Sequence, residues 1–182
     1  RRALPRFLAV RDLIAAGTIG EVRLVISRQF QQLPGVEQFA DGALPWRVNP
    51  ELSGGGFFFE AACHTFDFLD FLFGPITEVR AFAGNQARAY RPEDVVTATY
   101  RFASGVHGSG TWCYAADFDE EYNEIVGARG RIRSATSQPV PIRIFRGEAV
   151  EEVPVGDPDH VHQPLIQTIV DELNGIGKCA ST

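Results

Sequence analysis

The sequence predicts an α+β domain in which helices pack on one face of an open, largely antiparallel sheet. Apolar residues recur at helical spacing near both ends of the chain and in one internal segment, and alternating stretches separated by turn residues fill most of the remainder. Of the 182 residues, 45% are apolar and 22% are charged, a balance that suits one domain with a hydrophobic core.

Three helices are predicted from apolar spacing and from the residues that end them. The first covers Leu4 to Ala16, and Gly17 is placed to end it. The second, Phe57 to Phe73, follows a run of three glycines and stops at Gly74. The third, Pro164 to Leu173, has a proline in its first turn, where a missing N–H is tolerated.

The strands are predicted from alternation of polar and apolar residues. In the segment Glu21 to Leu33, Leu24 and Ile26 point one way and Ser27 and Gln29 the other, which predicts a strand with one wet face. Residues 34–50 are expected to form a long irregular stretch. Later strands, several of them joined by hairpin turns, are expected at residues 77–90, 95–102, 106–114, 122–126, 131–134, 140–145 and 149–155.

The composition narrows the range of partners. The net charge of −6 argues against nucleic acid and against an anionic membrane surface, because both require clustered Lys and Arg. No stretch resembles a membrane span or a signal peptide. The three cysteines form no CxxC pair, which is typical of a reduced, cytoplasmic protein. A small neutral substrate or a protein partner fits this composition better.

The chain contains no methionine, begins inside the first predicted helix and stops without a closing element. We therefore expect residues 1–182 to be one domain trimmed at both ends from a longer protein.

The segment from Gly54 to Gly74 carries the candidate chemistry. On a helix of about 100° per residue, Glu60, His64 and Asp67 fall within about 60° of one another. Most of the remaining circumference is apolar, which predicts a helix buried on more than one side. Ionisable groups on such a helix require partners. A carboxylate beside an imidazole supplies one and also makes an acid/base pair.

Two alternatives to acid/base chemistry remain open for this segment. Glu60 and His64 can form an ion pair with a purely structural role. Glu60, His64 and Asp67 can also bind a divalent ion in a metal-dependent isomerase or hydrolase. Their spacing matches neither HExxH nor a Cys/His finger, so we predict no metal.

The block SGGGFFFEAACHTFDFLDFLFGPI resembles a signature of the glucose–fructose oxidoreductase, inositol dehydrogenase and MocA family. That signature is a glycine run, an acidic residue, a histidine four residues later, a further Asp and a leucine-rich stretch ending in Leu-x-Gly. The segments IAAGTIGEV, LPWRVNPELSGGG, EDVVTATYRFASGVHGSGTWCY and HQPLIQTIVDELNGIGKCAST resemble other parts of the family in the same order. Glu60 stands where the family usually has Asp, and Ala62 where it often has Gly, which puts the substrate in doubt.

The resemblance implies the substrate-binding, catalytic and oligomerisation domain of an NAD- or NADP-dependent oxidoreductase acting on a sugar, polyol or related carbonyl compound. The Rossmann domain that binds most of the cofactor is absent, because no GxGxxG occurs here, so the chain alone is expected to be inactive. The implied acid/base is His64, held by Glu60. Further implied contacts are Trp46, Arg47, Asp67, Tyr114 and His162 with substrate, and Gly55 and Gly56 with cofactor.

The resemblance also implies a homodimer or homotetramer formed through the face of the sheet. A non-catalytic oligomerisation module of a dehydrogenase-like protein is the alternative function, since Glu60 departs from the usual Asp.

Overall fold

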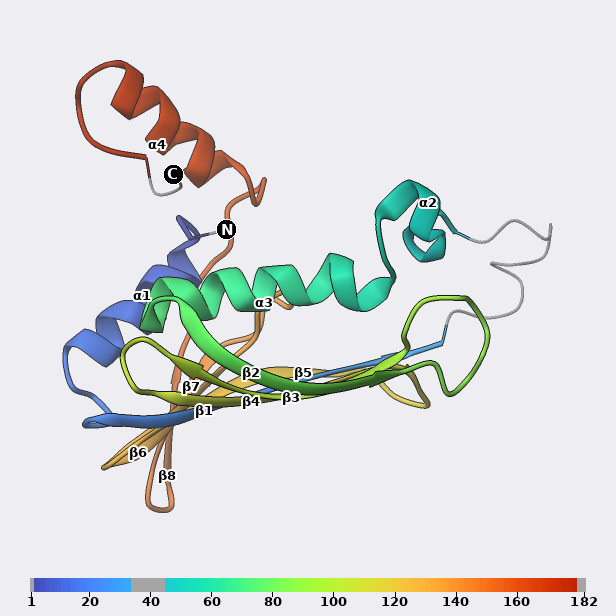
Figure 1. The fold of residues 1–182 in the computed structure, drawn as a ribbon. Coiled ribbons are helices and arrows are strands. Elements are labelled where there is room, and N and C mark those ends of the chain that lie inside the picture. The colour runs from blue at the N-terminus through green and yellow to red at the C-terminus, as the bar shows by residue number, and fades with distance from the viewer. Residues whose placement is uncertain (1, 34–44, 180–182) are drawn as a thin grey trace.

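The computed structural model describes residues 2–33 and 45–179. The predicted helices and most predicted strands begin and end close to the predicted positions, and Figure 1 shows their arrangement. Of the stretch 34–50 predicted to be irregular, residues 34–44 lie outside the described residues, and a 3-10 turn and a short helix begin in the rest. The elements are α1 (Pro5–Ala15), β1 (Val22–Gln32), the 3-10 turn η2 (Trp46–Val48), α2 (Pro50–Ser53), α3 (Phe57–Phe73), β2 (Ile76–Gly84), β3 (Val95–Phe102), β4 (His107–Ala116), β5 (Glu120–Gly127), β6 (Gly130–Ser134), β7 (Ile142–Arg146), β8 (Ala149–Val153) and α4 (Gln163–Leu173).

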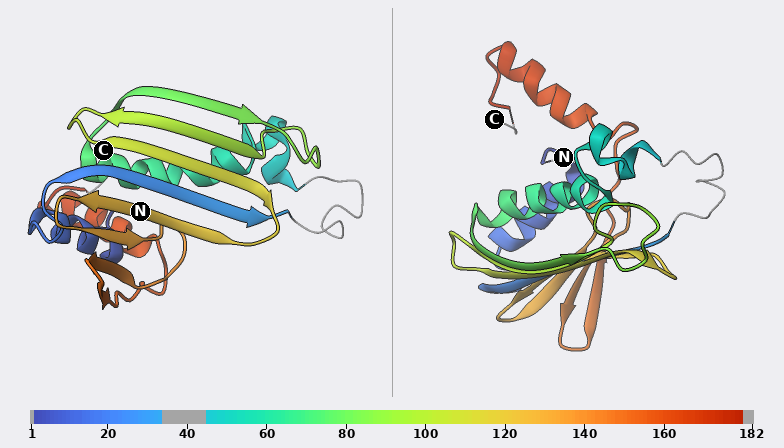
Figure 2. Two further views of the ribbon diagram at one scale, coloured as in Figure 1. Left: turned by 90° about the horizontal axis from the view of Figure 1, so that it is seen from below. Right: turned by 45° about the vertical axis from the view of Figure 1, so that its right-hand side comes forward.

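The strands of the described residues form one eight-stranded sheet in the order β2-β3-β4-β1-β5-β6-β7-β8. β1 runs parallel to β4, and every other neighbouring pair is antiparallel. Helices α1 and α3 lie on one face of the sheet, and the view from below shows the other face open (Figure 2). This arrangement confirms the predicted fold class.

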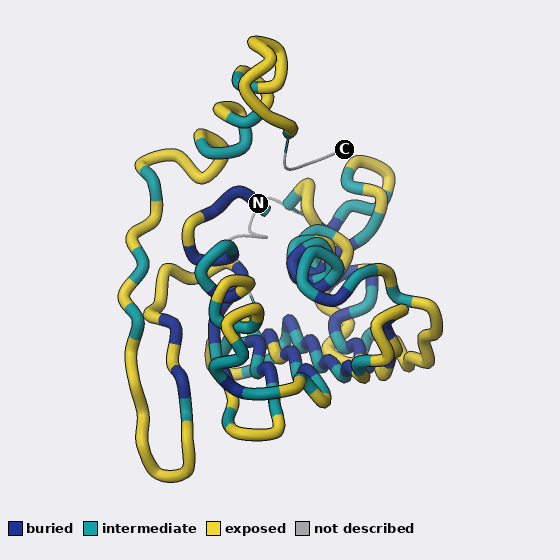
Figure 3. Tube along the Cα trace, turned by 90° about the vertical axis from the view of Figure 1, so that its left-hand side faces the viewer, coloured by how far each residue is buried: buried dark blue, intermediate teal, exposed yellow. Residues whose placement is uncertain are grey.

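The core lies between α3 and the sheet, where buried residues concentrate (Figure 3). The buried stripe of α3 includes Phe68, Leu69 and Phe73. Aromatic rings interlock across this layer. The ring pairs, with centroid separations, are Phe58–Trp112 (5.2 Å), Phe66–Trp112 (5.5 Å), Phe66–Tyr100 (5.7 Å) and Phe73–Phe102 (5.3 Å).

Two glycines of β4 make room for these rings. A Cβ atom at Gly108 would lie 2.0 Å from the Tyr100 ring, and one at Gly110 would lie 2.1 Å from the Trp112 ring. The glycines therefore let the two largest rings lie flat on the sheet, so that α3 can approach it closely.

A buried polar network joins the helices to the centre of the sheet. Arg6 of α1 donates from Nη2 to the carbonyl of Thr136 at 2.9 Å and forms an ion pair with Asp157. The Thr136 hydroxyl accepts from Asn123 Nδ2 at 2.8 Å, and Asn123 Oδ1 accepts from the Ser27 hydroxyl at 2.7 Å. The network fixes residues 135–137 against β1 and β5.

The polar face predicted for β1 is buried, so that prediction is wrong. Ser27 and Gln29 are 2% and 6% exposed, whereas Leu24 and Ile26 are only half-buried on the open face. The reason is that the polar network and the neighbouring pocket satisfy the buried polar groups.

The strand predicted at residues 77–90 ends at Gly84. After it, the Asp94 carboxylate accepts from the backbone N–H groups of Gln86 and Ala87, both at 2.7 Å, and Asn85 Oδ1 accepts from the Arg88 N–H at 2.8 Å. These side chains capture the donors that would continue the ladder.

The prediction that the second helix is buried on more than one side is also wrong. On α3, Phe59 and Cys63 are exposed, and Glu60, His64 and Asp67 are only half-buried. The helix packs as a single layer, so its outer stripe stays accessible. No helix in the described part of the chain is long and apolar enough to cross a membrane.

We predict that Arg6→Met lowers the free energy of unfolding by about 3 kcal/mol, because Asp157 loses its ion-pair partner and the Thr136 carbonyl loses a donor in a largely buried place. Urea unfolding of the purified chain measures this. Arg11→Met on the exposed side of the same helix is the matched control and should change stability by less than about 1 kcal/mol. Equal losses in the two variants would contradict the structural role given to Arg6.

Candidate active site

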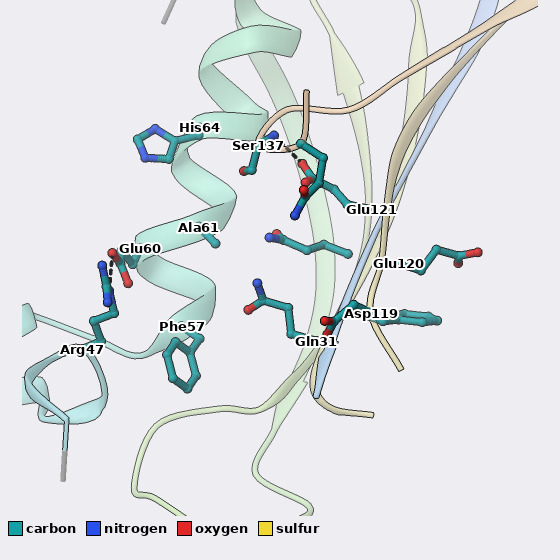
Figure 4. A pocket seen from close by; sticks show the side chains of 13 residues that line it. Gln31, Arg47, Phe57, Glu60, Ala61, His64, Asp119, Glu120, Glu121 and Ser137 are labelled. Carbon is teal, nitrogen blue, oxygen red and sulfur yellow. Dashed lines mark hydrogen bonds and ion pairs between the residues drawn. The ribbon is translucent and has the colours of Figure 1, made fainter. Parts of the chain in front are cut away.

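An open pocket of about 600 Å³ lies between α3 and the ends of β1 and β5 (Figure 4). Ten of its thirteen lining residues are polar, and Phe30, Phe57 and Ala61 supply the apolar part. The lining residues are Gln29, Phe30, Gln31, Arg47, Phe57, Glu60, Ala61, His64, Asp119, Glu120, Glu121, Ser137 and Gln138.

The helical wall carries the predicted acid/base residues. Glu60 and His64 lie one turn apart on α3, and both line the pocket (Figure 4). Arg47 Nε donates to Glu60 Oε1 at 2.7 Å, and its guanidinium lies over the Trp46 ring, 5.1 Å from the centroid. Arg47 is thus the residue that holds Glu60, and a hydrogen bond between Glu60 and His64 stays a prediction.

The opposite wall is built by the pairing of β1 with β5. Gln29 and Glu121 are direct partners in this antiparallel register, and both point toward the helices. Gln29 Oε1 accepts from the hydroxyl of Tyr114 at 3.2 Å. Tyr114 is 1% exposed, and this burial raises the pKa of its phenol far above the usual value, so the hydroxyl keeps its proton and donates.

Glu121 is held in place by backbone donors. Its Oε1 accepts from the N–H groups of Thr136 at 2.9 Å and Ser137 at 2.8 Å. At the rim, Asp119 Oδ1 accepts from the backbone N–H of Gln32 at 2.9 Å, and Glu120 pairs with Arg28 at 3.3 Å. The far wall is therefore rich in acceptors, and main-chain donors set the positions of two of them.

The structure brings together three of the predicted site residues: Arg47, Glu60 and His64. It does not bring the others to the pocket lining. Asp67 pairs with Arg2 at 2.7 Å, and so ties α3 to the start of the chain. Tyr114 lies one layer below the pocket, and the exposed His162 precedes α4.

The predicted cofactor contacts, Gly55 and Gly56, approach their own chain closely. A Cβ at Gly55 would lie 2.6 Å from the Cβ of Phe59, and one at Gly56 would lie 2.5 Å from the Cβ of Pro92. Internal packing thus accounts for the absence of side chains here, and contact with a cofactor stays a prediction. Among the described residues, no group of three or more His, Cys, Asp or Glu is placed to hold a metal ion.

Sequence reasoning missed the far wall, including Gln29, Gln31, Glu121 and Ser137. One signal was available. Alternation in β1 places Gln29 on the same side as Val25, which is fully buried, and a polar residue on a buried face marks either a network or a site. The pairing of Gln29 with Glu121 has no signal in the local sequence.

The domain has an open sheet with helices on one face and a pocket beside α3. These features define an α+β domain of the dehydrogenase C-terminal type. Residues 7–133 match the family described as the GFO/IDH/MocA C-terminal domain. The chain belongs to this family of oxidoreductases, as the resemblance in its sequence predicts.

Two curated relatives and one solved structure illustrate the similarity. Oxidoreductase P35 of Formosa agariphila is 30% identical over 170 residues, which are 93% of this chain and 52% of that protein. Inositol 2-dehydrogenase of Rhizobium meliloti is 28% identical over 167 residues, 86% of this chain and 46% of that protein. An oxidoreductase from Agrobacterium radiobacter, solved in complex with NAD+, L-tartaric acid and magnesium, shares the fold at 17% identity, with a TM-score of 0.76 over 99% of this chain and 55% of that one. The chain thus spans about half the length of these proteins.

We predict that Tyr114→Phe lowers the free energy of unfolding by about 1–2 kcal/mol, because the buried Gln29 oxygen loses its donor. Tyr100→Phe is the matched control: its ring is also buried, but its hydroxyl lies 3.5 Å from the Ser109 carbonyl, and its other neighbour, the Ser27 hydroxyl, already donates to Asn123. We therefore expect a smaller loss for this variant. Urea unfolding measures both.

The same variants test the titration of the phenols. Burial raises the pKa of Tyr100 to about 12 and that of Tyr114 further, from the ordinary 10.0. The unfolded chain therefore releases these protons first, and stability falls as the pH rises above 10. Each Phe variant should lose less stability above pH 10 than the wild-type chain does. An unchanged slope of the free energy of unfolding against pH would contradict the raised pKa of the phenol.

Proposed function

We propose that this chain is the substrate-binding and catalytic half of an NAD(P)-dependent oxidoreductase that acts on a sugar, a polyol or a related carbonyl compound by hydride transfer. The observation that carries the proposal is the position of His64, which lies on α3 among the residues that line a mostly polar pocket (Figure 4). Membership in an oxidoreductase family supports it, as does the NAD+ bound to the Agrobacterium radiobacter oxidoreductase, which has the same fold.

When bound, the nicotinamide accepts or supplies the hydride. The part left to this chain is the proton on the substrate oxygen. His64 would take this proton when a hydroxyl is oxidised and return it when a carbonyl is reduced. Glu60, one turn earlier on α3 and held by Arg47, would be the carboxylate that orients the imidazole.

Gly55 and Gly56 lead directly into the N-terminus of α3, which is one wall of the pocket. Their missing side chains make room for Phe59 and Pro92, so a role beside the nicotinamide rests on the resemblance to the family. We propose that the two glycines border the cofactor, that a Rossmann domain elsewhere in the natural protein holds most of it, and that the chain alone is inactive. The free thiols of Cys63 and Cys113 support a reduced, cytoplasmic setting.

We predict that His64→Ala in the complete natural protein lowers kcat by roughly 10²–10⁴-fold while leaving nicotinamide binding and the Tm close to wild type. Nicotinamide absorbance against a panel of sugars and polyols, with NAD and NADP, measures turnover, and fluorescence titration measures cofactor affinity.

The matched control is His160→Ala, an exposed histidine outside the pocket, which should retain full turnover. Robust turnover by His64→Ala would move the proton transfer to another group. A loss shared by both variants would show only that the protein tolerates histidine changes poorly.

Self-association is the second function that a specific observation favours. The open sheet face presents Ile26, Tyr122 and Phe145 between charged residues, and at the edge strand Phe82 is 85% exposed. We propose that a second copy of the chain covers this face, as a dimer or as half of a tetramer. A face that assembles and a helix that catalyses are compatible.

We predict that Ile26→Lys, at the centre of this face, converts the oligomer to monomer, because a lysine would be desolvated by the facing sheet. Light scattering coupled to gel filtration measures the mass. Leu52→Lys on the helical side is the control and should leave the mass unchanged. A wild-type protein that is monomeric at every concentration would overturn the assembly.

A further inference from the structure

We propose that Gln29 and Glu121 form a hydroxyl-recognition pair that selects uncharged or cationic polyols and rejects anionic ones such as uronates and sugar phosphates. The proposal deepens the function given above and rests on it, because it names the substrate class for the same pocket. It is independent of which residue moves the proton.

The pair is placed by the sheet rather than by flexible segments. Gln29 and Glu121 are direct cross-strand partners, so their Cβ atoms lie about 5 Å apart on the same face. Each is fixed by its own contacts: Gln29 by the Tyr114 hydroxyl at 3.2 Å, and Glu121 by the N–H groups of Thr136 and Ser137 at 2.9 and 2.8 Å. A rigid pair of this kind is suited to orienting a ligand.

Each member of the pair has hydrogen-bonding capacity left over. Gln29 is only 6% exposed, and its Oε1 is used by Tyr114. Within residues 2–33 and 45–179, no hydrogen bond uses its Nε2, and the side chain lines the pocket. In Glu121, which lines the pocket, both main-chain hydrogen bonds go to Oε1, which leaves Oε2 available as an acceptor. The wall thus presents one donor beside one acceptor.

A hydroxyl group is the complement of such a pair, because it donates and accepts at once. It can donate to the Glu121 carboxylate while its oxygen accepts from the Gln29 amide. A carboxylate or a phosphate dianion only accepts, so it leaves Glu121 unsatisfied and places like charges together.

The charges around the pocket act in the same direction. Four carboxylates line it, those of Glu60, Asp119, Glu120 and Glu121. Arg47 is paired with Glu60, and Arg28 with Glu120. In the described part of the chain, no ion pair compensates Asp119 or Glu121. An anionic ligand would therefore meet uncompensated negative charge at the far wall.

The test measures binding by calorimetry on the complete natural protein saturated with nicotinamide cofactor. The ligands are glucose, myo-inositol and glucosamine on one side, and glucuronate and glucose 6-phosphate on the other. The variant is Glu121→Gln, which keeps an oxygen to accept from the Thr136 and Ser137 N–H groups and so preserves the fold. Glu51→Gln, an equal change of charge on the exposed surface of α2 outside the pocket lining, is the control.

We expect at least one uncharged or cationic ligand to bind roughly tenfold or more tightly than either anionic ligand. Glu121→Gln should lower the affinity for that ligand roughly tenfold, since a hydrogen bond to a charged group is lost. It should also reduce the ratio between this affinity and the affinity for the anionic ligands. Glu51→Gln should leave both affinities unchanged.

The proposal would be overturned if the wild-type protein bound an anionic ligand more tightly, or if no ligand bound at all. It would also be overturned if Glu121→Gln left the ratio of the affinities for uncharged and anionic ligands unchanged, or if Glu51→Gln changed it equally. Turnover of the same ligands distinguishes a failure of the proposed ligand selection from a failure of the proposed oxidoreductase function. The expected binding order without hydride transfer would sink the oxidoreductase function and keep this inference, and preferred turnover of anionic substrates would do the reverse.

Discussion

The packing of α3 on the sheet is the constraint on which the other features depend. The rings of Phe58, Phe66 and Phe73 interlock with those of Tyr100, Phe102 and Trp112, and two glycines of β4 leave the room that these rings occupy. This contact fixes the rotation of the helix about its axis. Once the aromatic stripe faces the sheet, Glu60 and His64 must lie on the accessible side and line the pocket.

The far wall of the pocket depends on a second, polar layer. Arg6, Thr136 and Asn123 hold the segment after β6 against β1 and β5, and Glu121 holds the same segment from the pocket side. Aromatic packing thus positions the helical wall of the pocket, and a polar network positions the far wall. The acceptors on the far wall are therefore held in position before any ligand binds, and holding them costs little further entropy on binding.

Much of the fold and the helical wall of the site could be predicted from sequence, for reasons that differ by element. Glycines flank Phe57–Phe73, so its predicted bounds agree with α3, and helical spacing places Glu60 and His64 on one stripe. The end of β2 was missed because Asp94, ten residues further along the chain, captures the N–H groups after Gly84. Gln29 and Glu121 were missed because only the pairing of β1 with β5 makes them neighbours, and no local pattern encodes that register. Asp67 shares the helical stripe but pairs with Arg2, a contact that the spacing along α3 cannot reveal.

The most direct test of the central claim is a crystal structure of the complete protein with nicotinamide cofactor and an uncharged polyol. The geometry of the pocket predicts that one hydroxyl lies within about 2.6–3.2 Å of a ring nitrogen of His64, and that another lies between Gln29 Nε2 and Glu121 Oε2. A polyol bound between these walls with its reacting carbon toward the nicotinamide would support both the proton transfer and the selection of hydroxyl groups. A polyol seated elsewhere, or one whose reacting oxygen meets no atom of His64, would contradict them.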